Sequence, residues 1–394
     1  MAVLRRVSRA CALLRLIMAC SRRLILCLWV ALLMAPSPGA DAQPASRGTF
    51  VGTVRDAETG AALPGAHVFI AASMLGTTTD STGHFRLAGI PRGAHRVYVS
   101  MLGYASATID TLVQNASIDT LAVRLQPTVL SAGEATVTAE RDPKWHDRLE
   151  KFERLFIGTS ARADQCTLQN PEVLSFETKW WGRFSAHARE PLIIDNRALG
   201  YRIRYHLKAF NASGGTVRWD GEPFFQPLTP RDSAEAARWA AERQTAYAGS
   251  LRHFLRALLA RQTREEGFVV YRHPSDAFRP TSSRFRVSAD RLLDPRPDPS
   301  LSAMNFFGRL EIIYRHEPET DRFLRWQGTY YERGPRSQTS YLELNEHPVT
   351  IDADGEIVEP YGATAYGYFA FERLADAVPS EYRPRAAAAS HPPR

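Results

Sequence analysis

Residues 48–126 alternate apolar and polar positions in short runs that are separated by turns containing glycine and proline. An apolar side chain at every second position is the pattern of a half-buried β-strand. Several such strands at near-regular spacing predict an all-β sandwich for this part of the chain. The side chains expected in its core include Val68, Phe85, Val97 and Val99.

The second part of the chain, residues 144–382, carries helical periodicity. Apolar residues at steps of four, three and four predict a helix that ends before Gly158: Trp145, Leu149, Phe152 and Phe156. A longer helix is expected from Thr229 as N-cap toward Gly267, with a kink at Gly249-Ser250. Its arginines are expected on the solvated side, or in a groove for an anionic ligand: Arg238, Arg243, Arg252, Arg256, Arg261 and Arg264.

Strand patterns surround these two helices. From Tyr201 to Lys208, apolar residues alternate with Arg202, Arg204, His206 and Lys208, which predicts a half-buried strand with a cationic outer face. Further strands are expected at 174–176, 192–194, 268–271, 283–287, 309–314, 323–331, 339–344 and 349–357. This mixture predicts an α+β C-terminal domain over residues 144–382, after a linker at 127–143 and before a disordered tail at 383–394.

The N-terminal segment has the pattern of an export signal. The apolar run Leu24–Met34 follows two arginines and is too short to span a bilayer, and Ala40-Asp41-Ala42 is an A-x-A cleavage site. We therefore expect residues 1–42 to be a signal peptide that is cut between Ala42 and Gln43. Three alternatives stay open: a start at Met18, lipidation at Cys20, and an uncleaved anchor.

Charge and cysteine content narrow the function classes. The formal net charge is +7, but six arginines and only one acid lie in residues 1–42, so the remaining chain is nearly neutral. A nearly neutral chain lacks the excess of basic residues that is typical of a protein that binds nucleic acid. Only Cys166 remains after the signal, so the mature chain is expected to form no internal disulfide.

Three spaced strings in the first domain carry a family resemblance: Gly52 to Val68 (GTVRDAETGAALPGAHV), Gly76 to Phe85 (GTTTDSTGHF) and Ile90 to Gly93 (IPRG). The domain resembles the carboxypeptidase regulatory-like domain of exported Bacteroidetes-type proteins. The resemblance implies a seven-stranded, prealbumin-like sandwich of the carbohydrate-binding-like class. In metallocarboxypeptidases this module accompanies a separate zinc domain, and the H-x-x-E ligand pattern of that domain is absent from this sequence.

The linker contains a short segment with a possible partner. Glu134–Ala139 is similar to the TonB box that follows this domain in outer-membrane receptors, where an extended segment pairs with the edge of a sheet. The rest of the chain is too short for a receptor barrel. The other interpretation is a plain hinge.

The C-terminal domain resembles the uncharacterised region that follows the regulatory-like domain in the same kind of protein. The carrying segments include Asn170–Val173, Asn196–Tyr201, Tyr247–Ser250 and Glu265–Phe268. The resemblance implies a similar fold and export to the same compartment. It implies no activity, because none is known for that region.

No motif in the sequence defines a catalytic, cofactor or metal site. Ser250 and His253 lie three residues apart in the predicted helix, without the sharp turn that a serine nucleophile needs. Asp352-Ala-Asp-Gly355 resembles the start of a calcium loop but lacks the later acidic ligands, which favours a hairpin turn. The tryptophans could stack on a sugar, and a buried aromatic core is the alternative: Trp180, Trp181, Trp219 and Trp239.

Three functions remain after these exclusions. The first is a non-enzymatic cell-envelope protein, in the periplasm or at the outer membrane, that binds or scaffolds a partner protein or an envelope glycan. The second is an accessory of TonB-dependent uptake that uses Glu134–Ala139. The third is a hydrolase whose site in residues 144–382 carries no recognised motif. No cofactor is expected.

Overall fold

The computed structural model describes residues 47–114, 117–128, 143–180, 182–274, 284–288, 291–298 and 300–384. The expected cleavage site at Ala42–Gln43 and the TonB-box-like segment Glu134–Ala139 lie outside the described residues. Arg383, the first residue of the expected tail, is described and donates a hydrogen bond from Nη2 to Asp354 Oδ1 at 2.7 Å. Of the helices described, none combines the length and apolar character needed to cross a membrane.

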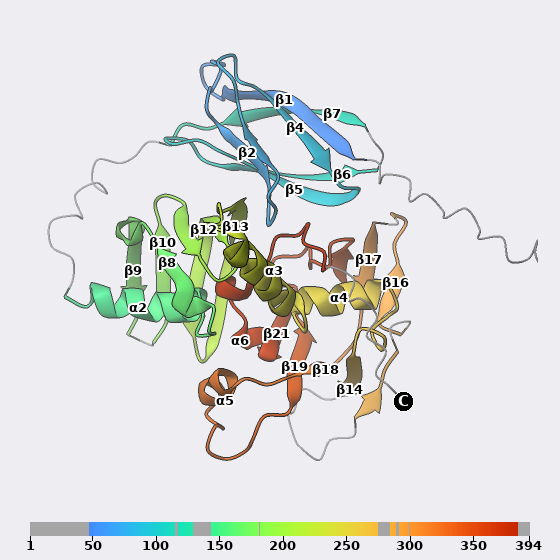
Figure 1. Cartoon of the computed structure of the whole chain (residues 1–394). Helices are drawn as coiled ribbons and strands as arrows, with labels where there is room; N and C mark the ends of the chain where they lie inside the picture. Colours follow the sequence, from blue (N-terminus) through green and yellow to red (C-terminus); the bar gives the residue numbers. More distant parts are fainter. Residues whose placement is uncertain are drawn as a thin grey trace, which may run out of the picture. The chain divides into compact units, whose positions relative to one another are not determined.

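The first domain is a two-layered sandwich (Figure 1). Its strands are β1 (Gly48–Asp56), β2 (His67–Ile70), β3 (Gly76–Thr78), β4 (His84–Ile90), β5 (Gly93–Ser100), β6 (Ala107–Val113) and β7 (Ile118–Leu125). One layer has the order β4-β1-β7 and the other β3-β2-β5-β6, and β1 runs parallel to β7. The predicted sandwich is confirmed, because Val68, Phe85, Val97 and Val99 are all buried in one core.

The next element, α2 (Trp145–Phe156), covers a six-stranded antiparallel sheet. The strands are β8 (Cys166–Leu168), β9 (Leu174–Thr178), β10 (Phe184–Ala188), β11 (Leu192–Asn196), β12 (Tyr201–Ser213) and β13 (Thr216–Pro227), and short 3₁₀ turns precede β8 (Ala163–Gln165) and β9 (Pro171–Val173). Phe152 and Phe156 of α2 pack edge-on against Phe210 and Tyr205, with ring centroids 4.9 Å and 4.8 Å apart. The helix predicted from steps of four and three is therefore confirmed.

The long helix expected from Thr229 is two helices, α3 (Ser233–Tyr247) and α4 (Leu251–Leu259). The first begins later than predicted because Asp232 is its N-cap, with a side chain that accepts from the Glu235 N–H at 2.7 Å. Gly249 has φ 76°, a left-handed conformation that ends the first helix. Ser250 then caps the second helix.

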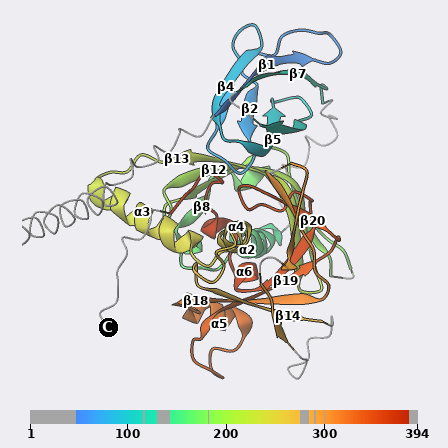
Figure 2. The ribbon, with the colours of Figure 1, turned by 90° about the vertical axis from the view of Figure 1, so that its right-hand side faces the viewer.

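Helix α4 packs against two further sheets, and Figure 2 shows it among strands β18, β19 and β20. One sheet has the order β15-β14-β18-β19-β21 and the other β16-β17-β20. The strands are β14 (Phe268–His273), β15 (Phe285–Arg286), β16 (Leu293–Pro295), β17 (Leu301–Met304), β18 (Arg309–Pro318), β19 (Ser337–Leu344), β20 (Val349–Asp352) and β21 (Ala363–Gly367). Phe254 and Leu258 of the helix are fully buried in this core.

The strand expected at 323–331 is wrong, because this segment begins with helix α5 (Asp321–Gln327). The Thr320 hydroxyl accepts from the Phe323 N–H at 3.2 Å and caps the helix, and Gly328 ends it with φ 79°. Strands β8, β10, β13, β16, β17 and β21, the helix α6 (Tyr368–Phe371) and the 3₁₀ turns, including Leu374–Asp376, were not predicted.

The sandwich contacts the β12–β13 hairpin directly. Backbone hydrogen bonds join Ala72 N to Pro223 O at 2.7 Å and Phe225 N to Ser73 O at 2.9 Å. Phe69 of β2 stacks on Phe224 at a ring-centroid distance of 5.1 Å. The outer face of β12, expected to be cationic and solvated, is therefore partly covered by the first domain.

Candidate ligand pocket

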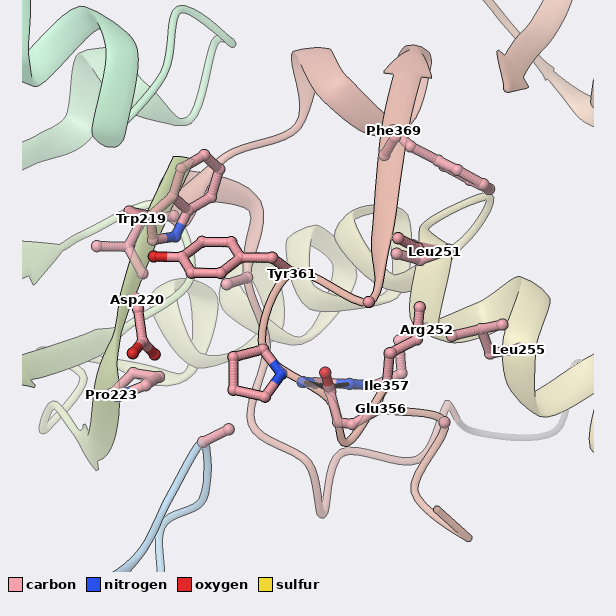
Figure 3. Close-up of a pocket in the computed structure, with 18 of the residues that line it drawn as sticks. Trp219, Asp220, Pro223, Leu251, Arg252, Leu255, Glu356, Ile357, Tyr361 and Phe369 are labelled. Carbon is pink, nitrogen blue, oxygen red and sulfur yellow. Dashed lines mark hydrogen bonds and ion pairs between the residues drawn. The ribbon is translucent and has the colours of Figure 1, made fainter. Parts of the chain in front are cut away.

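A cavity of about 860 Å³ lies between β13, the start of α4, the segment that follows β20, and α6 (Figure 3). Sandwich residues from β5, from β6 and from the turn after β2 complete its wall. Ligand pockets typically have volumes of about 300–1,000 Å³, so the cavity has the size of a binding site. Its aromatic lining comprises Tyr205, Trp219, Trp326, Tyr361, Tyr366 and Phe369.

The β13 side of the cavity carries Trp219 and Asp220 (Figure 3). The indole of Trp219 packs edge-on against Phe156 of α2, with ring centroids 6.2 Å apart, so the core of the β8–β13 sheet fixes its position. Asp220 is half-buried and has no ion-pair partner among the described residues. Its carboxylate can therefore accept hydrogen bonds from a ligand in the cavity.

Tyr361 lines the cavity from a strained backbone position (Figure 3). Its φ of 61° lies in the left-handed region, which residues other than glycine seldom adopt. The Asn345 side chain stabilises this conformation, because its Nδ2 donates to the Tyr361 carbonyl oxygen at 2.7 Å and to Thr364 Oγ1 at 3.0 Å. Strain of this kind is concentrated at functional positions, and here it places a phenol ring on the cavity wall.

Helix α4 carries two arginines that already have partners, and one of them, Arg252, lines the cavity. Arg252 Nε donates to Glu356 Oε1 at 2.6 Å, and Arg256 Nε donates to the Asp354 carbonyl oxygen at 2.8 Å. The two side chains are only 16% and 12% exposed. The expectation of a solvated arginine face is wrong for this pair, because the loop after β20 covers them. Their charges stabilise the fold and are not available to an anionic ligand.

The loop that covers these arginines is the Asp352-Ala-Asp-Gly355 segment. Asp352 Oδ1 accepts the backbone N–H groups of Asp354 and Glu356, both at 2.9 Å. A bridge between Ile351 and Ile357 closes the turn, which confirms the hairpin interpretation over the calcium loop. Burial raises the pKa of the Asp352 carboxyl to about 7, although these two N–H groups act in the opposite direction.

Ser250 and His253 do not form a nucleophile–base pair. The Ser250 hydroxyl donates to the Tyr247 carbonyl oxygen at 2.7 Å and accepts from the backbone N–H of His253 at 3.2 Å. The imidazole accepts the Gly249 N–H on Nδ1 at 3.1 Å, and its Nε2 lies 3.1 Å from Glu266 Oε2. Ser250 is therefore an N-cap rather than a mid-helix residue, and both side chains support the break between α3 and α4.

The segment after α6 brings two charged side chains, Glu372 and Arg373, to the cavity wall. Within the described part of the chain, neither the Glu372 carboxyl nor the Arg373 guanidinium takes part in a hydrogen bond or ion pair. Burial lowers the pKa of Arg373 to about 10. Burial raises the pKa of Glu372 well above its usual range, and the nearby Asp376 carboxylate reinforces this. At neutral pH Arg373 is charged, whereas the raised pKa of Glu372 favours its uncharged form.

The structure also places the other candidate residues named from the sequence, namely the lone cysteine and the tryptophans. Burial raises the pKa of the Cys166 thiol to about 12, so the nucleophilic thiolate is scarce at neutral pH. Trp239 is buried as expected, whereas Trp180 is 91% exposed and the core interpretation is wrong for it. Across the described ranges, no three His, Cys, Asp or Glu residues come together in a way suited to a metal ion.

Sequence reasoning named Trp219 but missed Tyr361, Glu372 and Arg373. The aromatic stretch from Tyr361 to Phe371 was the available signal. Nothing local distinguishes Glu372-Arg373 from an ordinary surface pair, because the residues that bury them come from distant parts of the chain.

Residues 49–126 match the carboxypeptidase regulatory-like domain, which confirms the resemblance predicted for the first part of the chain. No protein of curated function matches the sequence. The class defined by the fold is thus a β-rich chain with a regulatory-like sandwich and a second, α+β domain.

Solved structures resemble the chain only in part. They include 3-chlorocatechol 1,2-dioxygenase from Rhodococcus opacus (14% identity, 22% of this chain and 62% of that chain, TM-score 0.19). The major pilin subunit of Bacillus cereus is 13% identical (21% of this chain, 31% of that chain, TM-score 0.19). A chain in a type II cohesin–X-dockerin complex from Acetivibrio cellulolyticus has 18% sequence identity. The match covers 29% of this chain and 79% of that chain, with a TM-score of 0.19. This chain spans less than two thirds of the dioxygenase and of the pilin.

Proposed function

We propose that the chain is a non-enzymatic protein of the bacterial cell envelope that binds a glycan in the cavity next to β13. The single observation that carries this proposal is the composition of the cavity wall. Trp219 and Tyr361 offer aromatic faces for the C–H surfaces of sugar rings, and Asp220 offers a hydrogen-bond acceptor for hydroxyl groups. This combination suits a ligand that is apolar on its faces and polar at its edges.

Most carboxylates around the cavity already have hydrogen-bond or ion-pair partners, and this supports binding rather than catalysis. For example, Asp376 holds Arg162 Nη1 at 3.0 Å and Glu222 holds Lys208 Nζ at 2.7 Å. Groups with fixed structural partners are poor acids, bases and nucleophiles for a substrate.

The envelope location is proposed from the sequence. The apolar run Leu24–Met34 and the cleavage motif Ala40–Ala42 support export, with Gln43 as the first mature residue. N-terminal sequencing of the protein from envelope fractions tests this, and a full-length cytoplasmic product would contradict it. A TonB-type partner at Glu134–Ala139 is a separate proposal, to be tested by crosslinking from that segment.

The binding proposal is tested on immobilised neutral and acidic polysaccharides with the full mature chain. Tyr361→Asn removes the ring while keeping a residue type that tolerates positive φ, so the loop is expected to stay folded. We expect this variant and Trp219→Leu to lose most of the binding. Trp180→Leu and Tyr331→Asn are matched controls, because these exposed side chains do not line the cavity. Full binding by both cavity variants would refute the proposal.

One observation favours a second candidate, a glycan hydrolase. A general acid needs a carboxyl with a raised pKa. Burial raises the pKa of Glu372 well above its usual range, and Asp220 lines the same cavity. Release of reducing ends from the polysaccharides that bind, abolished by Glu372→Gln, would establish this activity. The absence of any release leaves binding as the function.

A further inference from the structure

Arg373 differs from the other half-buried arginines that line the cavity. Arg252 and Arg96 each have a carboxylate of the chain as partner, whereas Arg218 is exposed. Within the described residues the Arg373 guanidinium has no hydrogen-bond or ion-pair partner, and its Cζ lies 4.9 Å from the centroid of the Trp219 ring. Gly158, at φ 115°, leaves space for the side chain of Arg373, since a Cβ there would lie 2.9 Å from the Arg373 Cβ.

A cation on a partly buried wall without an anion is unfavourable for the fold. Burial lowers the pKa of Arg373 to about 10, which still leaves the guanidinium charged at neutral pH. The stack on Trp219 offsets only part of the lost hydration. The guanidinium therefore keeps unused hydrogen-bond donors in a cavity large enough for a ligand.

Neither of the two acids that follow α6 forms an ion pair with this cation. Burial raises the pKa of Glu372 well above its usual range, which favours the uncharged form of its carboxyl. Asp376, the next acid along the chain, is held by the guanidinium of Arg162. Neither of these two acids therefore neutralises the charge of Arg373.

We propose that the glycan bound in this cavity is acidic, and that Arg373 binds its carboxylate or sulfate group. This inference rests on the proposed glycan-binding function and adds the charge of the ligand to it. A planar guanidinium suits both anions through paired N–H donors, and the aromatic rings bind the sugar beside the charge.

The test is isothermal titration of the full mature chain with three probes of similar length: an oligogalacturonate, its methyl ester, and a sulfated galactan oligosaccharide. We expect at least one anionic probe to bind tenfold or more tightly than the uncharged ester, with a preference that weakens in high salt. Arg373→Gln is expected to reduce the affinity for the anion to that for the ester while leaving the ester's affinity unchanged. Arg373→Lys should restore part of the preference.

Arg325→Gln is the matched control, because this exposed guanidinium also stacks on an aromatic ring, that of Tyr330 at 4.3 Å, away from the cavity. It should keep the preference. Equal affinity for ester and acids, or an anion preference that survives Arg373→Gln, overturns the acidic ligand while the glycan-binding function stands. No binding of any of the three probes overturns both proposals.

Discussion

His206 of β12 lies against Tyr98 of β5, with ring centroids 4.8 Å apart, and thereby joins the C-terminal domain to the sandwich. The same interface contains His67, whose ring is 4.9 Å from that of Phe224. Burial lowers the pKa of both imidazoles to about 4, and the cations Arg204 and Lys208 add to the effect on His206. Both histidines are therefore neutral in the folded protein at physiological pH.

The first prediction is that this interface weakens in mild acid. The folded-state pKa of about 4 lies below the unfolded value of 6.5, so stability is complete above pH 6.5 and is lost as the pH falls toward 4. We expect the free energy of unfolding to fall by about 1–2 kcal/mol per histidine between pH 7.5 and pH 5. Urea titrations at the two pH values measure this difference.

His206→Gln provides the control, because glutamine does not titrate. The variant should lose roughly half of the pH dependence between pH 5 and 7.5. A wild-type stability that stays constant over this range would contradict the neutral state of the buried histidines.

The parts of the fold that sequence could predict are those in which neighbouring positions determine the structure. The period-two runs of the sandwich and the steps of four and three in α2 identify their own buried faces, as at Val97 and Phe152. The segment at 323–331 misled the prediction because its apolar residues fit a strand, while the cap at Thr320 and the left-handed Gly328 select a short helix.

The cavity could not be predicted, because its features depend on residues far apart in the chain. Arg252 looks like a solvated helix residue until Glu356, about a hundred positions later, pairs with it. Arg373 looks equally ordinary, and only the structure shows that its half-buried guanidinium lies over Trp219 and pairs with no carboxylate in the described part of the chain.

The second prediction concerns the close contact between Gly200 and Trp239. Gly200 has φ 68°, and a Cβ there would lie 2.3 Å from the indole, whose Nε1 donates to the Arg197 carbonyl oxygen at 2.8 Å. Gly200→Ala is expected to lower the free energy of unfolding by about 3 kcal/mol, from the clash and the strained φ together. Gly215→Ala, at φ 80° in open space, should cost only about 1 kcal/mol. Equal losses in chemical denaturation would show that the contact with Trp239 is unimportant.

The third prediction uses the titration of Asp352. Its folded-state pKa of about 7 exceeds the ordinary value of 3.8 for an aspartate, so the stability due to the protonated form is lost as the pH rises through 7. Asp352→Asn keeps an acceptor oxygen for the turn and removes the charge. We expect it to be more stable than the wild type by about 1–2 kcal/mol at pH 8.5 and about equal at pH 4. Thermal unfolding at both pH values checks this, and a variant that is less stable at pH 8.5 would contradict it.

The fourth prediction tests the core of the sandwich. Phe85 is 5% exposed, so Phe85→Ala is expected to cost roughly 3–5 kcal/mol of unfolding free energy through lost contacts and a cavity. Leu102→Ala, at a side chain that is 83% exposed, should change stability by less than about 0.5 kcal/mol. A Phe85→Ala protein as stable as the wild type in urea would be incompatible with this core.

The last prediction separates a binding role of Arg373 from a structural one. Removing a charge that stabilises the fold lowers the free energy of unfolding. Removing a buried charge that has no counter-ion raises it, because such a charge destabilises the fold. Because burial lowers the pKa of Arg373 to about 10, its protonated form is disfavoured in the folded state at neutral pH. Arg373→Gln is therefore expected to raise the free energy of unfolding by about 1 kcal/mol, after the lost stack on Trp219 is subtracted. Arg252→Gln, which breaks the ion pair with Glu356, should lower it. Urea denaturation of the two variants at pH 7 compares them directly, and a loss of stability in both would identify Arg373 as a structural cation.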